Sequence, residues 1–187
     1  MNDQFIEAMQ SVAVAAHPFR VFHENYGGST PRLDPQNPDR EDRLGDSGED
    51  WIVSMFGWPV PNRLLKPKGD GGSDWVASKP GMPNIRLNVK TSKPNVSETV
   101  WRNRFNLQIK EQDVVRADWF ISVVDTGSGF EILGYATQQD LLQDGKRKES
   151  KKLLDGKSTL FMNREILFKK LRPFNQNLLR GYEVKSL

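Results

Sequence analysis

The sequence contains no cysteine and only two histidines, His17 and His23, among its 187 residues. Without cysteine, the chain has no disulfide, no thiolate zinc site and no cysteine nucleophile. The two histidines lie near the N-terminus, without a spacing that suggests a transition-metal cluster. Any metal site must therefore use mainly carboxylate oxygens, which favour a hard cation such as Mg²⁺.

Long apolar runs are also missing, because no stretch approaches the roughly 20 residues of a membrane-spanning helix. The N-terminal segment MNDQFIEAMQSVAVAAHPF contains acidic residues and lacks the basic start of a signal peptide. We therefore expect a cytoplasmic protein without a membrane partner. With 36% hydrophobic and 27% charged residues, the chain is expected to fold as a single domain, residues 1–187.

The net charge of +3 is small but unevenly spread. Residues 146–187 hold 12 basic and 4 acidic residues, whereas residues 1–145 hold 15 basic and 20 acidic residues. A basic C-terminal part is typical of contact with a polyanion, because lysine and arginine neutralise phosphates. The run KRKESKK at residues 146–152, expected as a loop, is equally well explained as a solvated basic surface.

Periodicity and turn residues predict a mixed order of helices and strands. An apolar face predicts an N-terminal helix at residues 4–16, and residues 47–56 return to the helical pattern. Residues 25–46, rich in Gly, Pro, Asn and Asp, are expected to form a mobile loop. The segments expected as strands are 63–65, 73–76, 85–91, 118–124 and 130–135.

The last two of these strands are near-continuous apolar runs around a Thr-Gly-Ser-Gly turn, which is typical of central strands joined tightly. A short helix is expected at residues 137–142, capped by Thr137. Residues 101–109 are ambiguous, and residues 160–174 are compatible with a helix or a strand. The pattern predicts an α/β fold, a mixed central β-sheet flanked by α-helices.

Polar residues on the expected strands indicate a shared site. Asn88 and Lys90 lie two residues apart on one strand, so their side chains face the same side. If the neighbouring strand pairs with theirs as a hairpin, Asp74 lies beside them. The helix that carries Glu49 can cover that edge, and the four polar groups would then line one cleft.

The order of these motifs resembles that of the PD-(D/E)xK, or restriction-endonuclease-like, nucleases. A helical Glu, GDGGSD, a strand reading NVKTS, ADWFISVV and FEILGYAT follow one another within residues 45–142. The resemblance implies a restriction-endonuclease-like fold and hydrolysis of DNA phosphodiester bonds with Mg²⁺, for which Mn²⁺ can substitute. It implies catalytic roles for Glu49, Asp74, Asn88 and Lys90, with Asp74, Asn88 and Glu49 at the metal.

These residue types suit that chemistry. Mg²⁺ prefers carboxylate and water oxygens, polarises a phosphoryl oxygen and lowers the pKa of a bound water. Asp74 would be the principal ligand, and Glu49 would hold the metal directly or through water. Lys90, a compact charge with three donors, would orient the attacking water or stabilise the negative charge of the phosphorane.

Two positions depart from the family pattern. Ser73 stands where the family name has proline, and Asn88 stands where an acid is expected. An amide is a neutral ligand, so the alternative is a catalytically silent relative that binds nucleic acid or a protein partner. Asp70, hinged by two glycines, is a second candidate for the missing acid.

Three candidates also have purely structural interpretations. Asp74 follows Gly-Gly-Ser and is also explained as the cap of a turn. Lys90 is also explained as an edge-strand lysine that discourages pairing between sheets. Glu49 forms, with Asp46, the pattern of a helix capping box.

Basic residues next to an aromatic one predict contact with nucleic acid. Trp101 and its arginine neighbours can stack on a base or bind phosphate, or Trp101, Asn103 and Phe105 can alternate on a strand that faces the core. A homodimer is compatible with the sequence. The residues expected to contact DNA are Lys93, Arg102, Arg104, Lys146, Arg147 and Lys148.

Overall fold

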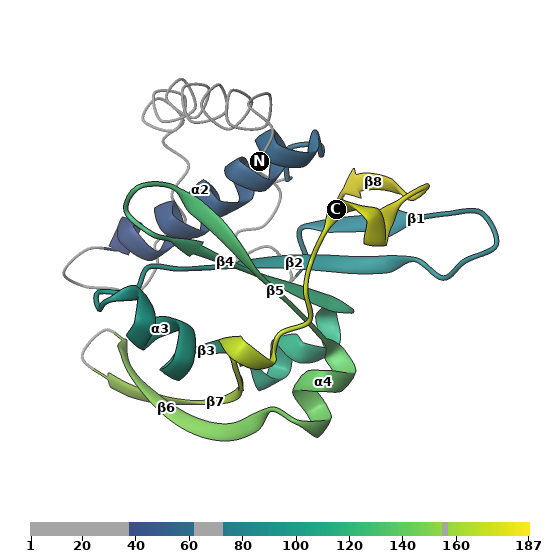
Figure 1. The fold of residues 1–187 in the computed structure, drawn as a ribbon. Coiled ribbons are helices and arrows are strands. Elements are labelled where there is room, and N and C mark those ends of the chain that lie inside the picture. Colours follow the sequence, from purple (N-terminus) through teal and green to yellow (C-terminus); the bar gives the residue numbers. More distant parts are fainter. Residues whose placement is uncertain (1–37, 62–72, 155–156) are drawn as a thin grey trace.

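The structure, a computed structural model, describes residues 38–61, 73–154 and 157–187 (Figure 1). Its helices are α2 (Pro38–Phe56), α3 (Glu98–Arg104) and α4 (Gln138–Gln143), with 3-10 turns η1 (Glu111–Arg116), η2 (Phe168–Lys170) and η3 (Gln176–Leu179). Its strands are β1 (Trp75–Ser78), β2 (Ile85–Ser92), β3 (Asn106–Lys110), β4 (Trp119–Asp125), β5 (Phe130–Thr137), β6 (Lys146–Leu154), β7 (Lys157–Leu167) and β8 (Glu183–Ser186).

The fold is α/β, as the sequence predicts, with a mixed central sheet of order β5-β4-β2-β1-β8. Strands β1 and β2 form the expected antiparallel hairpin, and β2 runs parallel to β4. Strands β4 and β5 form a tight antiparallel hairpin, whose turn is closed by the Thr126 N–H donating to the Gly129 carbonyl at 2.9 Å. A second sheet has the order β3-β7-β6.

Helix α2 is longer than the sequence pattern predicts. It begins at Pro38, so the expectation of a mobile loop is wrong for residues 38–46. Proline is favoured in the first helical turn, and the acids of the sequence PDRED favour the positive end of the helix dipole. Gly57 ends the helix with a φ of 66°, as expected from the sequence. Residues 25–37 and the expected helix at 4–16 lie outside the described residues, as does the expected strand at 63–65.

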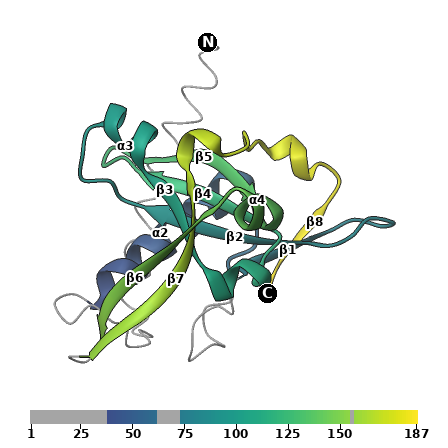
Figure 2. The ribbon, with the colours of Figure 1, turned by 90° about the horizontal axis from the view of Figure 1, so that it is seen from below.

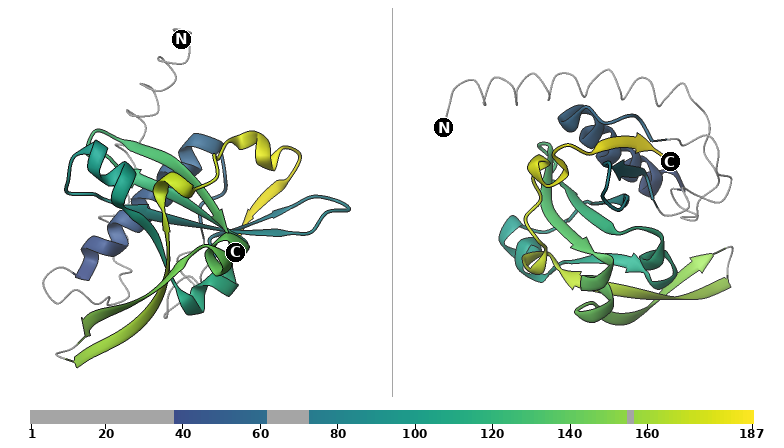
Figure 3. Two further views of the ribbon diagram at one scale, coloured as in Figure 1. Left: turned by 60° about the horizontal axis from the view of Figure 1, so that its bottom comes forward. Right: turned by 90° about the vertical axis from the view of Figure 1, so that its right-hand side faces the viewer.

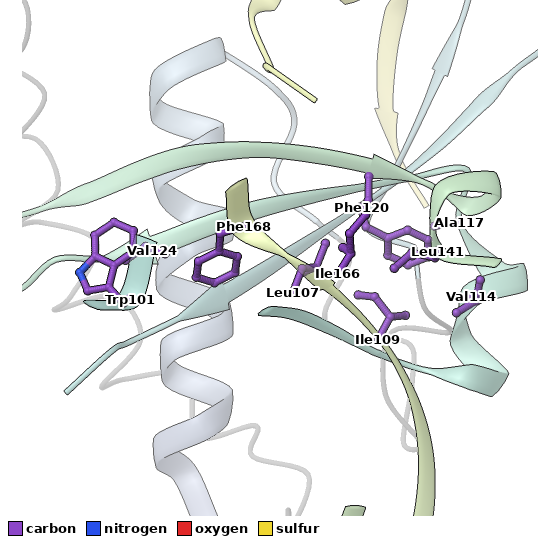
Figure 4. Packing of buried hydrophobic residues seen from close by; sticks show 11 residues of the cluster. Trp101, Leu107, Ile109, Val114, Ala117, Phe120, Val124, Leu141, Ile166 and Phe168 are labelled. Carbon is purple, nitrogen blue, oxygen red and sulfur yellow. The ribbon is translucent and has the colours of Figure 1, made fainter. Parts of the chain in front are cut away.

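The two faces of the central sheet pack against different layers. Helix α2 covers one face, and the second sheet with α3 covers the other (Figures 1 and 3). Ile52 of α2 belongs to a buried cluster with Leu87 and Val89 of β2. Phe120 of β4 belongs to the other cluster, which includes Ile166 of the second sheet (Figure 4). The central sheet therefore has two buried faces.

Residues 146–152 were expected as a basic loop, and this expectation is wrong. They lie in β6, which pairs antiparallel with β7 along its length. Backbone hydrogen bonds stabilise this pairing, and lysine is well tolerated on an edge strand such as β6. Residues 160–174, open between helix and strand, are strand up to Leu167. The β6–β7 hairpin extends beyond β3, as Figure 2 shows.

The ambiguous segment 101–109 divides between α3 and β3. Trp101 is buried on α3, so the alternative of a strand with Trp101, Asn103 and Phe105 on one side is wrong. The expected Thr137 cap is confirmed, because the Asp140 N–H donates to Thr137 Oγ1 at 3.0 Å. None of the helices in the described part of the chain has the length and apolarity of a membrane-spanning segment.

Candidate active site

Asp74 and Asn88 lie side by side on neighbouring strands. The Asp74 N–H donates to the Leu87 carbonyl at 2.8 Å, which places Asp74 at the start of the β1–β2 ladder. Asp74 Oδ2 accepts a 2.6 Å hydrogen bond from the Val89 N–H. Asp74 Oδ1 lies 3.5 Å from Asn88 Nδ2. The hairpin therefore brings this acid and this amide together, as the sequence predicts.

Both side chains are deeply buried. Asp74 is 3% exposed and Asn88 is fully buried. Asn88 Oδ1 has no hydrogen-bond partner among the residues that the structure describes. A buried polar atom without a partner costs about 1–3 kcal/mol, and in native proteins such an atom frequently marks an ordered water or an ion. Asn88 Oδ1 is therefore a candidate ligand atom.

Lys90 lies on the same face of β2 as Asn88, because side chains alternate along a strand. It is half-buried and forms no ion pair within the described part of the chain. In the central sheet β2 is an inner strand, between β1 and β4, which argues against the interpretation of Lys90 as an edge-strand lysine. Its ammonium charge is not neutralised by a carboxylate of the described residues.

Glu49 lies on α2, which packs on the other face of the sheet. Its neighbour Gly48 packs so closely on β2 that a side chain there would collide with the Thr91 hydroxyl. Thr91 alternates with Lys90, so α2 covers the opposite face of the sheet. The capping-box interpretation of Glu49 is also wrong, because Asp46 lies inside the helix and not at its start. Asp74, Asn88 and Lys90 therefore share one face, and the role of Glu49 stays a prediction.

The remaining ligand set is small. Residues 38–61, 73–154 and 157–187 contain no group of three or more His, Asp or Glu side chains that could hold a metal ion. Asp74 and Asn88 provide one carboxylate and one amide oxygen. This set fits Mg²⁺, which commonly takes one or two carboxylates and keeps several waters. Asp70 lies outside the described residues.

Ser122 is a member of this site that the sequence analysis missed. It lies on β4 directly opposite Lys90 and is fully buried. Its Oγ has no hydrogen-bond partner in the described part of the chain. The sequence feature that points to it is a single serine inside the apolar run WFISVV.

Two of the basic residues expected at DNA lie near the C-terminal end of β4 and are paired with carboxylates. Lys93 Nζ lies 2.6 Å from Asp125 Oδ2. Arg102 pairs with Glu131 at 2.6 Å and Glu98 at 2.7 Å. Hydrogen bonds to these two carboxylates, Glu131 first, raise the pKa of Arg102. Both cations therefore contribute to local structure.

Arginine 102 also lies over the ring of Trp101, with its Cζ atom 4.5 Å from the ring centroid. The buried indole and the paired guanidinium form a closed contact between α3 and β5. This contact leaves the face of Trp101 covered by Arg102. Stacking of a base on Trp101, the alternative that the sequence suggests, would require Arg102 to move.

The basic residues of β6 differ in their partners. Arg147 pairs with Glu111 at 2.8 Å, and its hydrogen bond is the main reason that the pKa of Glu111 is lowered. Lys148 Nζ lies 3.3 Å from Glu165 Oε1. Lys146, like Arg104 on α3, is exposed and has no ion-pair partner among the described residues. Of the six candidates for DNA contact, these two are the cations without a carboxylate partner.

The side chains that the fold brings together are therefore Asp74, Asn88, Lys90 and Ser122, from three adjacent strands or their immediate ends. Their function has to be inferred from their own chemistry and from the order of motifs in the sequence. No family model matches this chain, and no curated protein or solved structure is found to match it.

Proposed function

We propose that this protein is a Mg²⁺-dependent nuclease of restriction-endonuclease-like fold that hydrolyses DNA phosphodiester bonds. The observation that carries the proposal is the pairing of Asp74 with Asn88 across the β1–β2 hairpin, with Lys90 on the same face. The order of motifs within residues 45–142 supports the same function. Hydrolysis then depends on side chains from one hairpin.

Asp74 and Asn88 are the proposed ligands of the cation. Asp74 Oδ2 is held by the Val89 N–H, which orients the carboxylate and directs Oδ1 toward Asn88. Asn88 Oδ1 lacks a hydrogen-bond partner among the described residues, and the Asn88 amide must turn to place Oδ1 in the position of Nδ2 beside Asp74 when both residues bind one cation. The cation, when bound, polarises the phosphoryl oxygen and lowers the pKa of a bound water.

Lys90 is proposed to act on the phosphate. Its ammonium has no carboxylate partner among the described residues, so its charge is available to a substrate anion. In the reaction, water forms the new bond to phosphorus and gives up a proton, while the bond to the leaving sugar oxygen breaks and that oxygen takes up a proton. Negative charge accumulates on the phosphoryl oxygens meanwhile, and a lysine beside them stabilises it.

A catalytically silent nucleic-acid-binding protein is the second candidate. Two observations favour it: Asp74 is only 3% exposed, and the second ligand position holds a neutral amide, Asn88. In this case the basic C-terminal part would still bind DNA, while the site would hold no metal. The two candidates differ in whether divalent cations bind and whether phosphodiester bonds are cut.

The test is a cleavage assay on plasmid, linear duplex and single-stranded DNA, with Mg²⁺, with Mn²⁺ and with a chelator. Parent protein is compared with Asp74→Ala and Lys90→Ala, and Asp144→Ala and Lys169→Ala serve as matched exposed controls. We expect cutting only with the cation, lost in the two site variants and kept in both controls. Cutting at the parent rate by a folded Asp74→Ala or Lys90→Ala protein would contradict the proposal.

A further inference from the structure

Two buried oxygen atoms on the polar face of the central sheet lack hydrogen-bond partners among the described residues. They are Asn88 Oδ1 on β2 and Ser122 Oγ on β4, and both residues are fully buried. Most buried polar atoms in native proteins are paired, so two exceptions on one face call for a physical cause. A shared cause requires the two groups to be neighbours.

The strand register makes them neighbours. Lys90 is directly opposite Ser122 in the parallel ladder of β2 and β4, and Asn88 is two residues earlier on β2. Adjacent strands lie about 4.8 Å apart, and residues two apart on one strand are separated by roughly 6.6 Å. All three side chains project to the same side, so Ser122 is next to Lys90 and diagonal to Asn88.

Strand β5 lies on the side of Ser122 that faces away from Lys90. Gly134 on β5 lies opposite Ser122. A Cβ atom on Gly134 would meet the Arg172 carbonyl, because Arg172 lies beside β5 in an antiparallel bridge with Tyr135. The Tyr135 and Arg172 backbones are joined by two hydrogen bonds of 2.9 and 2.8 Å. Ser122 is fully buried, with Gly134 beside it on β5 and Lys90 beside it on β2.

The three groups have complementary hydrogen-bonding capacity. Asn88 Oδ1 only accepts, Lys90 Nζ only donates, and Ser122 Oγ does both. A buried water typically makes about three hydrogen bonds, with a range of two to four. One water can donate to Asn88 Oδ1 and to Ser122 Oγ and accept from Lys90 Nζ. Because an amide oxygen has two lone pairs, Asn88 Oδ1 can accept from this water and still take part in the proposed cation site.

We infer that Asn88, Ser122 and Lys90 hold one ordered water, and that Ser122 is a positioning residue for this water. The water site rests on burial and register alone. Its role rests on the proposed function: it is the water that Lys90 orients for attack on phosphorus. Ser122 then limits where the water oxygen can stand, whereas Asp74 and the cation act on the phosphate.

The first test uses thermal unfolding of the full chain. If the Ser122 hydroxyl is hydrated, Ser122→Ala removes a hydrogen bond and lowers the midpoint of unfolding. If the hydroxyl is an orphan in apolar surroundings, its removal raises the midpoint, because the desolvation penalty disappears. Ser73→Ala is the matched control, since the buried Ser73 hydroxyl donates to the Arg116 carbonyl and its loss must lower the midpoint.

The second test is a high-resolution crystal structure of the parent and of Ser122→Ala. We expect a water within hydrogen-bonding distance of both Asn88 Oδ1 and Ser122 Oγ in the parent, and its loss or displacement in the variant. In a cleavage-competent protein, Ser122→Ala should lower kcat at least tenfold and leave KM unchanged.

The outcomes separate the two proposals. A raised unfolding midpoint together with an absent water overturns the water site, while Asp74→Ala and Lys90→Ala still decide the nuclease function. A water in place with an unchanged kcat in Ser122→Ala overturns the positioning role. A water in place in a protein that cuts no substrate supports the water site and contradicts the nuclease function.

Discussion

The two faces of the central sheet differ in what they bury. The face under α2 is mainly apolar and aromatic: Trp58 and Trp75 pack edge to face at 5.4 Å and Ile52 is fully buried, although the Thr91 hydroxyl there has no hydrogen-bond partner among the described residues. The opposite face is apolar at Phe120 but also contains buried Asn88 and Ser122. Both faces come from the same strands, so the difference depends on alternation along each strand and not on which strands are central.

The apolar residues of one face are explained by stability, whereas the buried polar residues of the other face need a different explanation. Burial of apolar side chains contributes about 25 cal/mol per Å², so the face under α2 is accounted for by the hydrophobic effect. Buried polar groups stabilise much less and cost free energy when unpaired. Asp74, Asn88 and Ser122 are therefore poorly explained by stability, and they lie together on the face that also presents Lys90. Substitutions on either face test this difference.

The largest effect is expected for Asn88→Asp. It places a second carboxylate in a fully buried position next to Asp74, where the present amide nitrogen lies 3.5 Å from Asp74 Oδ1. An unpaired buried charge costs about 3–5 kcal/mol, so the free energy of unfolding should fall without metal. Mg²⁺ should restore it and bind more tightly than in the parent.

Denaturant unfolding with and without Mg²⁺, together with calorimetric titration and a plasmid-nicking assay, measures these effects. Asn88→Asp should also cut faster than the parent if Asn88 limits metal binding. Asp70→Asn tests the alternative acid: if Asp70 supplies the missing charge, that variant loses cutting and Asn88→Asp changes little. Destabilisation of Asn88→Asp that Mg²⁺ does not relieve would show that no cation binds at this hairpin.

The next effect concerns the other face. Gly48→Ala should destabilise the protein by about 1–3 kcal/mol, because its methyl group collides with Thr91 where α2 meets β2. Gly45→Ala is the matched control on the same helix: no atom lies within 4 Å of a Cβ there, so helix propensity should stabilise it by up to about 1 kcal/mol. Equal effects of the two substitutions in denaturant unfolding would contradict the packing of α2.

Local signals predicted much of this fold. The alternation of residues 85–91, the apolar run of residues 118–124 and the Thr-Gly-Ser-Gly turn specify strands and a hairpin without reference to distant residues. The Thr137 cap is likewise local, because its capping box with Asp140 lies within four residues. The pairing of Asp74 with Asn88 follows from the same hairpin, which is why these two positions could be predicted together.

Tertiary choices could not be predicted in this way. Glu49 has a helical face compatible with the site, but which sheet face α2 covers depends on the close contact of Gly48 with Thr91. The strand at residues 146–152 depends on pairing with β7, which lies later in the sequence. Its many charged residues instead suggest an exposed loop. Ser122 gave a weak signal, since its significance lies in an unpaired hydroxyl and in its register with Lys90.

A smaller effect is expected where the chain closes over the polar face. Arg172 donates two hydrogen bonds to Asp140, at 2.7 and 2.8 Å, and these lower the pKa of Asp140 from 3.8 to about 2. A lowered pKa in the folded state means that the stabilisation is complete above pH 4 and is lost as the pH falls toward 2. Because the Arg172 side chain is 55% exposed, although that of Asp140 is 15% exposed, solvent screens the pair and its contribution is about 1 kcal/mol.

Unfolding of the parent and of Asp140→Asn, measured between pH 2 and 7, checks this pH dependence. The variant should be less stable than the parent at pH 7, and the difference should shrink between pH 4 and pH 2. Asp144→Asn, at the other end of α4, is the control for the loss of one negative charge. A difference that stays constant over this pH range would contradict the assigned role of Arg172.

The smallest effect is expected from single cations at the surface. Arg104 and Lys146 have no ion-pair partner among the described residues, whereas Lys93 and Arg102 are held by carboxylates. Each phosphate contact contributes about 0.9 to the slope of log affinity against log salt concentration, because a counterion is released. Arg104→Gln and Lys146→Gln should therefore each flatten the slope by about one, provided that these residues contact DNA.

Lys93→Gln and Arg102→Gln provide the comparison. These substitutions release Asp125 or Glu131 from its ion pair, so they should weaken DNA binding mainly by adding a free negative charge nearby. The slope should then change less than in Arg104→Gln. Binding to a short duplex between 50 and 200 mM salt, followed by fluorescence anisotropy, measures the slope for each variant. Slopes equal to the parent's in all four variants would place the DNA contact on other residues.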